Sequence, residues 1–166
     1  LIRLFEKWIY HQNVHVREIS RVVNFFQIQP KKAQIDVVDN CEFDQDTQVV
    51  VIQSDGKVNC DDSLIPALQW RQKQQTYSVF SDRLSDFVND RGIREMEASR
   101  VRLPQQCIKC KWVKLCGGGS LENRFSTKRG FDNPSIYCAG LMRFFDYITN
   151  FIQENGYPRE TIESAL

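Results

Sequence analysis

Apolar residues near both ends of the chain recur every three or four positions, which is the spacing of one face of an α-helix. This pattern predicts helices over 1–10, 16–26 and 141–152. The apolar positions that define them are Leu1, Leu4, Phe5 and Trp8 in the first, Ile19, Val22, Val23 and Phe26 in the second, and Leu141, Phe144, Phe145, Ile148 and Ile152 in the third. A further helix is expected over 80–88, and the last helix is expected to end at Asn155-Gly156.

The pattern changes between residues 48 and 60. A β-branched run at 48–53 predicts a buried strand, and the Asp55-Gly56 pair provides the positive φ angles that a tight hairpin turn needs. Residues 57–60 are expected to form the return strand, and 35–38 are a candidate third strand. The Gln-rich segment 69–78 is expected to lie on the surface.

These elements predict an α+β fold. We expect a small antiparallel β-hairpin and a cysteine-rich irregular segment over 107–138, both flanked by helices. The chain has 166 residues, of which 42% are hydrophobic and 26% charged, so it can bury a core of ordinary size.

The charge balance is close to neutral, with 22 Lys and Arg against 21 Asp and Glu. It gives no electrostatic reason to expect a nucleic-acid partner. The apolar runs are much shorter than the roughly 18–20 residues of a membrane span, so no membrane partner is predicted. No signal peptide is visible, and we expect a cytoplasmic protein. Because residues 1–10 already have a helical pattern, we expect the chain to be the back end of a longer protein.

The cysteines carry the chemical signal. Cys107 and Cys110 are three residues apart, Cys116 follows and precedes three glycines, and Cys138 comes from a separate segment. Cysteines three apart can direct both sulfurs at one metal, and four thiolates suit either Zn²⁺ or an iron–sulfur cluster. Zinc ribbons usually have two Cys-x2-Cys pairs and this chain has one, which favours iron–sulfur. Zinc and disulfide bonding stay open as alternatives.

The spacing Cys107-x2-Cys110-x5-Cys116-Gly-Gly-Gly-Ser120 with a distant Cys138 resembles the SPASM domain. This is the C-terminal auxiliary-cluster domain of radical SAM enzymes that modify ribosomally made peptides and proteins. The resemblance is extended by 123–126 (NRFS) and by 130–138 (GFDNPSIYC), which is similar to a segment of the cyclophane-forming peptide maturases. The hairpin 53–58, residues 62–64 and the helical stretch 1–26 also resemble those enzymes.

The resemblance implies that one [4Fe-4S] cluster is held by four cysteines, namely Cys107, Cys110, Cys116 and Cys138. SPASM domains usually have a further cysteine four residues after the third, which serves a second cluster. In this chain that position is Ser120. Cys41 and Cys60 are the remaining candidates for that second site, although free cysteines are often simply buried as small apolar residues. We therefore expect one complete cluster.

Trp112 lies between Cys110 and Cys116, and from that position we expect it to shield a cluster from water. The resemblance singles out Arg124 as a donor to a cluster sulfur or a group that binds peptide carboxylates, and a surface salt bridge is the open alternative.

The resemblance also implies a division into 1–30, a helical segment that follows a missing radical SAM barrel, and 31–166, a SPASM-like domain. The Cys-x3-Cys-x2-Cys loop that radical SAM chemistry needs does not occur in the sequence. S-adenosylmethionine would therefore bind only in the missing barrel, and this chain alone is expected to be inactive.

The implied parent enzyme is an oxidoreductase that crosslinks a ribosomally made precursor peptide. The expected partners are that peptide and the missing barrel of the same enzyme. The alternative is a stand-alone module in which the four thiolates hold structural zinc and which binds a protein or peptide.

Overall fold

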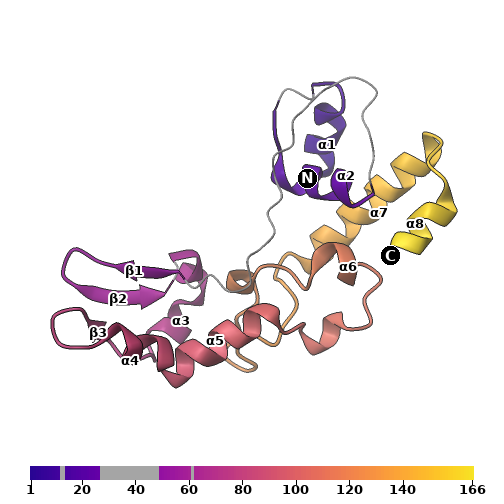
Figure 1. Cartoon of the computed structure of the whole chain (residues 1–166). Coiled ribbons are helices and arrows are strands. Elements are labelled where there is room, and N and C mark those ends of the chain that lie inside the picture. Colours follow the sequence, from indigo (N-terminus) through magenta and orange to yellow (C-terminus); the bar gives the residue numbers. More distant parts are fainter. Residues whose placement is uncertain (12–13, 27–48, 61) are drawn as a thin grey trace. The chain divides into compact units, whose positions relative to one another are not determined.

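The computed structural model describes residues 1–11, 14–26, 49–60 and 62–166 (Figure 1). The fold is α+β, with helices and one three-stranded antiparallel sheet, as the sequence predicts. The described residues form two compact units. The first contains 1–11, 14–26, 110–117 and 137–166, and the second contains 49–60, 62–109 and 118–136.

The first unit is helical. Its elements are α1 (Ile2–Trp8), α2 (Arg17–Phe25), α6 (Val113–Cys116), α7 (Cys138–Glu154) and α8 (Arg159–Ala165). They share one apolar core, whose buried members are Phe5, Trp8, Ile19, Val22, Phe26, Trp112, Leu115, Phe144, Phe145, Ile148, Ile152 and Ile162. The predicted helices at 1–10, 16–26 and 141–152 are therefore confirmed, although Leu1 and Leu4 are exposed.

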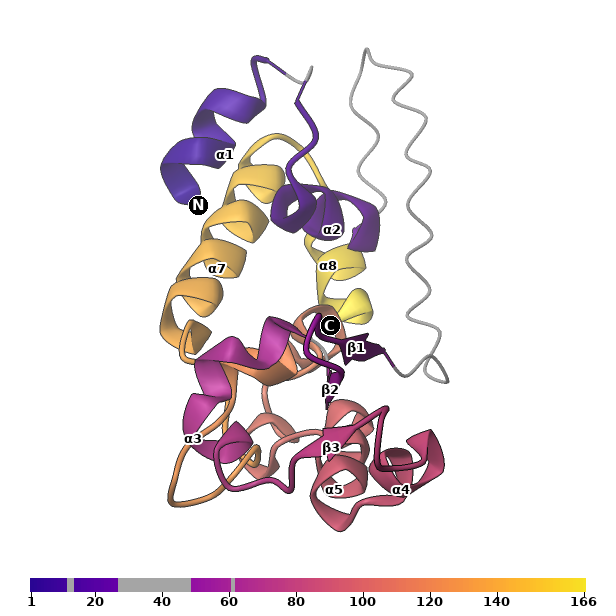
Figure 2. The same ribbon diagram turned by 90° about the vertical axis from the view of Figure 1, so that its left-hand side faces the viewer.

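Helices α1 and α7 lie side by side (Figure 2), and aromatic side chains of the two helices contact each other. The ring of Phe5 meets Phe144 and Phe151 edge-on, with centroids 6.5 Å and 5.4 Å apart. Helix α8, which the sequence pattern did not predict, begins after Pro158 and buries Ile162 in the same core. The Tyr157 hydroxyl donates to the carbonyl of Phe26, which joins the loop before α8 to the end of α2.

The second unit contains the sheet, formed by β1 (Val50–Ile52), β2 (Lys57–Cys60) and β3 (Tyr77–Ser78) in the order β1-β2-β3. The hairpin between β1 and β2 is the predicted one, and Gly56 in its turn has a φ of +80°. Strand β3 pairs with β2 through Tyr77 opposite Val58. The expectation that 69–78 is only a surface stretch is therefore wrong at its end, where Tyr77 is buried.

Short helices complete the second unit. They are η1 (Asp62–Ala67), α3 (Leu68–Arg71), α4 (Leu84–Asn89), α5 (Arg91–Val101), η2 (Gln105–Cys107) and η3 (Leu121–Asn123). The core of this unit is made by Val58, Cys60, Leu64, Ala67, Tyr77, Phe87, Ile93, Met96, Leu121 and Phe131. The helix expected over 80–88 begins only at Leu84, and Phe80 is 83% exposed.

Two predictions fall on residues outside the described ones: the third strand at 35–38 and the domain boundary after residue 30. The division into 1–30 and 31–166 stays a prediction. None of the helices in the described residues has the length and apolar character to cross a bilayer.

Candidate metal centre

Cys110 precedes α6 in the first unit, and Cys116 is the last residue of that helix. The carbonyl oxygen of Cys110 accepts the amide N–H of Val113 at 3.0 Å, and α6 ends at Cys116. Gly117 then takes a left-handed φ of +63° and donates its N–H to the Val113 carbonyl at 2.8 Å. Both cysteines are half-buried and pack against the apolar core of this unit. The two cysteines are therefore connected by a helical turn and not by an irregular loop.

Helix α2 supports the end of this turn. Arg21 Nη2 donates to the carbonyl oxygen of Cys116 at 3.3 Å. A positive charge is favourable at the carbonyl end of a helix. Arg21 was missed in the sequence, because no local pattern connects it with a cysteine 95 positions further along the chain.

Cys138 is the first residue of α7, which has 17 residues. Its Sγ lies 3.8 Å from Sδ of Met142, one helical turn further along. The side chain of Cys138 thus stands in the first turn of α7, at the end of the helix where the backbone N–H groups are free of intrahelical partners. The helix begins earlier than the predicted residue 141, which places Cys138 on the helix and not in the loop before it.

Cys107 ends helix η2 in the second unit and is buried. Its amide N–H donates to the carbonyl of Pro104 at 2.8 Å. The side chain of Asp132 accepts the amide N–H of Gln105 at 2.9 Å, which caps the same short helix from a distant loop. The backbone around Cys107 is thus held at two points.

A buried cation lies close to Cys107. Arg124 is 3% exposed, and its Nε and Nη2 donate to the carbonyls of Phe131 at 3.2 Å and Arg102 at 3.0 Å. Burial lowers the pKa of the Arg124 guanidinium, and negative charge on Cys107 and Asp132 opposes that shift. A buried charge is costly unless an opposite charge compensates it. The Arg124 guanidinium therefore provides a buried positive charge near Cys107 and Asp132.

The three glycines after Cys116 form a packed turn. Their φ angles are +63°, +82° and +81°, all in the left-handed region that glycine adopts at no steric cost. A Cβ on Gly118 would stand 2.8 Å from Cδ of Pro104, and one on Gly119 would stand 2.6 Å from Cβ of Ser135. Conformation and close approach both require glycine here, so the segment is not a plain flexible linker.

Trp112 lies between Cys110 and Cys116 in the sequence, directly before α6, and is 2% exposed. Its ring centroid is 5.5 Å from that of Phe145, and Nζ of Lys111 stands 4.7 Å from the centroid of the indole. Among the residues that the structure describes, Trp112 Nε1 is the one buried side-chain nitrogen or oxygen without a hydrogen-bond partner. The Trp112 ring is thus part of the apolar core against which Cys110 and Cys116 pack.

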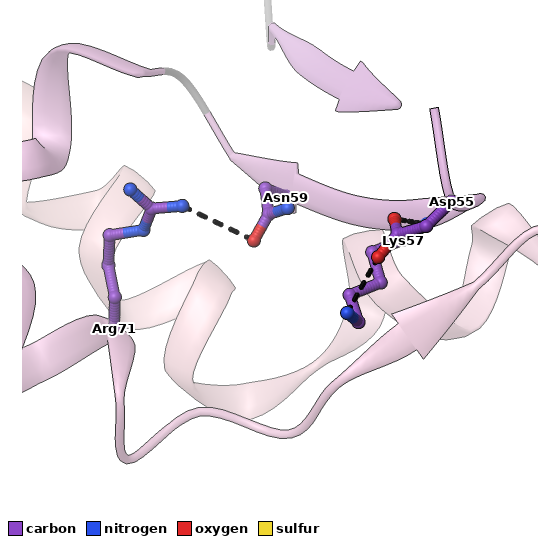
Figure 3. Close-up of polar contacts among 4 residues, drawn as sticks. All are labelled: Asp55, Lys57, Asn59 and Arg71. Carbon is purple, nitrogen blue, oxygen red and sulfur yellow. Dashed lines mark hydrogen bonds and ion pairs between the residues drawn. The ribbon is translucent and has the colours of Figure 1, made fainter. Parts of the chain in front are cut away.

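The candidate second site is only partly described. Cys41 lies outside the described residues. Cys60 ends strand β2, and burial raises the pKa of its thiol while the Arg71 guanidinium opposes part of that rise. Arg71 Nη2 donates to Asn59 Oδ1 at 3.4 Å (Figure 3), and these residues line a cavity of about 120 Å³. Cys60 itself belongs to the apolar core of the second unit.

The five described cysteines, Cys60, Cys107, Cys110, Cys116 and Cys138, form no disulfides with one another. Within the described residues, no group of three or more His, Cys, Asp or Glu side chains is close enough together to hold a metal ion. Cys110, Cys116 and Cys138 belong to the first unit and Cys107 to the second. Coordination by the four together stays a prediction from their spacing.

Comparison with known proteins gives one distant relation. The chain is 29% identical over 98 residues to a cysteine-type anaerobic sulfatase-maturating enzyme from Clostridium perfringens. The match covers 58% of this chain and 25% of that enzyme, so the chain spans about a quarter of the length of this relative. No family model matches the chain, and no solved structure matches it. The match agrees, at a coarse level, with the relation to radical SAM maturases that the cysteine pattern indicates.

Proposed function

We propose that this chain is the auxiliary cluster-binding part of a radical SAM enzyme that modifies a protein or peptide. The observation that carries the proposal is the cysteine spacing over 107–138. The similarity to a maturating enzyme, which covers 58% of this chain, supports it. In this proposal Cys107, Cys110, Cys116 and Cys138 are the ligands of one [4Fe-4S] cluster. An iron–sulfur cluster supplies one-electron transfer, at a potential set by the protein around it.

The chemistry of the residues around the four thiols fits such a group. Arg124 offers a buried positive charge near Cys107, and the start of α7 offers a helix N-terminus to Cys138. Both compensate the negative charge that thiolate ligands bring. Cys110 and Cys116 pack against the apolar core of the first unit, which contains Trp112.

The finer parts of the proposal concern the parent enzyme. We propose that S-adenosylmethionine binds in a barrel outside this chain, because the sequence has no Cys-x3-Cys-x2-Cys loop. The substrate would be a ribosomally made precursor peptide in which the enzyme forms a crosslink, in the cytoplasm. This chain would contribute the auxiliary cluster and brace the substrate path, without cleaving S-adenosylmethionine itself.

Single cysteine substitutions test the ligand set. Cys107→Ser, Cys110→Ser, Cys116→Ser and Cys138→Ser should each lower iron and sulfide content after anaerobic reconstitution. Cys60→Ala is the matched control, because that thiol is a buried core residue, and it should keep the wild-type iron content. If Cys116→Ser leaves both metal content and melting temperature unchanged, the proposal is wrong. Loss of iron in Cys60→Ala or Cys41→Ala would instead reveal a second cluster site.

A further inference from the structure

The cavity of about 120 Å³ in the second unit is lined by residues of β2, of α3 and of the segment that follows α3. Part of its lining is apolar, with Phe87 and Ile93 from the core of this unit. Sites for drug-sized ligands have volumes of about 300–1,000 Å³. This cavity therefore has room for one chemical group and not for a whole cofactor.

The described residues that line the cavity carry positive charge and no negative charge. Lys57 and Arg71 are the two cations, and no Asp or Glu is among these residues. Nζ of Lys57 is already paired with Oδ2 of Asp55 at 2.6 Å (Figure 3). Arg71 belongs to none of the ion pairs formed within the described residues. Its charge is therefore the one that the cavity can offer to an anion.

The Arg71 guanidinium has donors to spare. It has five N–H groups in a planar fork. Its hydrogen bond within the described part of the chain is the one from Nη2 to Asn59 Oδ1, and at 3.4 Å this bond is longer than usual (Figure 3). The side chain is half-buried, so water screens its charge less than it would at an open surface. A planar fork of N–H groups matches the two oxygens of a carboxylate.

The backbone that carries Arg71 is held in place. The Arg71 carbonyl accepts the amide N–H of Gln74 at 3.1 Å, and Gln74 Nε2 donates to the Trp70 carbonyl at 3.0 Å. The Trp70 ring meets Phe131 edge-on, with centroids 5.5 Å apart. Gly92 leaves room for the Gln74 amide, because a Cβ at Gly92 would stand 1.8 Å from Gln74 Oε1. The wall of the cavity is therefore a built turn.

The charge of Arg71 acts inside the cavity. Burial raises the pKa of the Cys60 thiol, which lines the cavity, and the Arg71 guanidinium opposes part of that rise. Arg100 and Glu97 also act on this thiol, but they pair with each other at 2.8 Å. Their charges therefore compensate each other, and the positive charge of Arg71 remains.

We propose that this cavity binds a carboxylate group of a peptide, either an acidic side chain or the chain end, through paired hydrogen bonds from the Arg71 guanidinium. One unpaired cation balances the single charge of a carboxylate. A phosphate monoester carries a charge of about −1.5 to −2 at neutral pH and would need more cations than the cavity offers. The proposal does not depend on the iron–sulfur cluster, because all the residues that carry it belong to the second unit and none is a proposed ligand.

The experiment titrates the full chain, labelled with ¹⁵N, with three small probes and follows the backbone signals of Asn59, Cys60 and Arg71 by NMR. N-acetylglutamate α-amide presents a side-chain carboxylate, and its isomer N-acetylglutamine presents a chain-end carboxylate. N-acetylglutamine amide is the neutral control. At least one isomer should shift these signals in a saturable way, and the neutral amide should not. The isomer that binds more tightly identifies the source of the carboxylate.

Three variants assign the binding to Arg71. Arg71→Gln should weaken carboxylate binding by about 10-fold or more, the loss typical of a hydrogen bond to a charged group. Arg71→Lys keeps the charge without the planar fork and should weaken it less. Arg94→Gln is the matched control, because Arg94 is exposed on α5 and does not line the cavity. It should keep the wild-type affinity. Melting temperatures check that each variant is folded.

Several results would overturn the proposal. They are the absence of a saturable shift with either isomer, equal binding of the neutral amide, and wild-type affinity in Arg71→Gln. If Arg71→Gln does not fold, wild-type affinity in Arg71→Lys overturns the paired contact. Tighter binding of inorganic phosphate than of both isomers overturns the choice of a carboxylate. None of these results bears on the cluster assignment, since the titration measures neither iron nor sulfide.

Discussion

A methyl group added at Gly119 tests whether the glycine turn after Cys116 is packed as the structure shows. Gly119 has a φ of +81°, and a Cβ there would stand 2.6 Å from Cβ of Ser135. For an L-residue the left-handed conformation costs about 1–2 kcal/mol. The steric overlap adds about 1–3 kcal/mol, as for other insertions into a packed site. Gly119→Ala should therefore lower the free energy of unfolding by about 2–5 kcal/mol.

Thermal melting of the full chain measures this loss. For a chain of this size, about 2–4 °C of melting temperature corresponds to 1 kcal/mol, so the expected decrease is about 4–20 °C. Two glycines provide matched controls. Gly130 has a φ of +57° and open space around a Cβ, so Gly130→Ala should show only the conformational cost. Gly140 lies in α7 with open space, and Gly140→Ala should raise stability by about 0.5–1 kcal/mol.

A double-mutant cycle separates the steric part from the conformational part. Combining Gly119→Ala with Ser135→Gly removes the atom that the new methyl group meets, and should recover about 1–3 kcal/mol relative to the sum of the single changes. A melting temperature of Gly119→Ala within about 1 °C of the wild type corresponds to a loss of about 0.5 kcal/mol or less. That result would show that the glycine turn is not packed in the left-handed conformation and would refute the reasoning.

Two further predictions concern the cores of the two units. Phe144→Ala should destabilise the protein by about 3–5 kcal/mol in urea unfolding, because the Phe144 side chain is 1% exposed. The control Phe80→Ala should change stability by less than about 0.5 kcal/mol, because Phe80 is 83% exposed. Similar losses for the two variants would contradict the assignment of the core. Because burial raises the pKa of the Cys60 thiol, its alkylation between pH 7 and 9, mapped by mass spectrometry, should be slower than that of a small-molecule thiol and should accelerate as the pH rises further. Alkylation of Cys60 at the small-molecule rate at pH 7 would show that the thiol is accessible and contradict its place in the core.

Periodicity was sufficient to predict the elements whose apolar face meets the core directly. Helix α7 buries Phe144, Phe145 and Ile148 at the predicted spacing, and the hairpin turns at Gly56 as the Asp-Gly pair indicates. These predictions hold because the signal and the packing involve the same residues. The start of α7 was misplaced, because Cys138, Ala139 and Gly140 precede the apolar repeat and carry no periodic signal.

The elements that the sequence did not predict depend on distant partners. Strand β3 has two residues in a Gln-rich surrounding and exists through its pairing with β2. Helix α8 is short and mostly polar, with Ile162 as its buried residue. The helix expected from residue 80 begins only at Leu84, because a repeat of apolar residues does not show which of them face the core.

The candidate site shows the same division. Cysteine spacing singled out the four proposed ligands, the resemblance singled out Arg124, and the position between Cys110 and Cys116 singled out Trp112. Sequence could not predict that Arg21 would bind the Cys116 carbonyl or that Asp132 would cap the helix that ends at Cys107. Both are contacts between segments far apart along the chain, which no local pattern encodes.

The most direct test of the central claim is the iron, sulfide and zinc content of anaerobically purified protein, measured together with its visible spectrum. Our account predicts about four irons and four sulfides per chain and broad brown absorption, as expected for one thiolate-bound [4Fe-4S] cluster. About eight of each would add a second cluster and make Cys41 and Cys60 its candidate ligands. One zinc per chain with no iron, in protein protected from air throughout, would contradict the account and identify a structural zinc module.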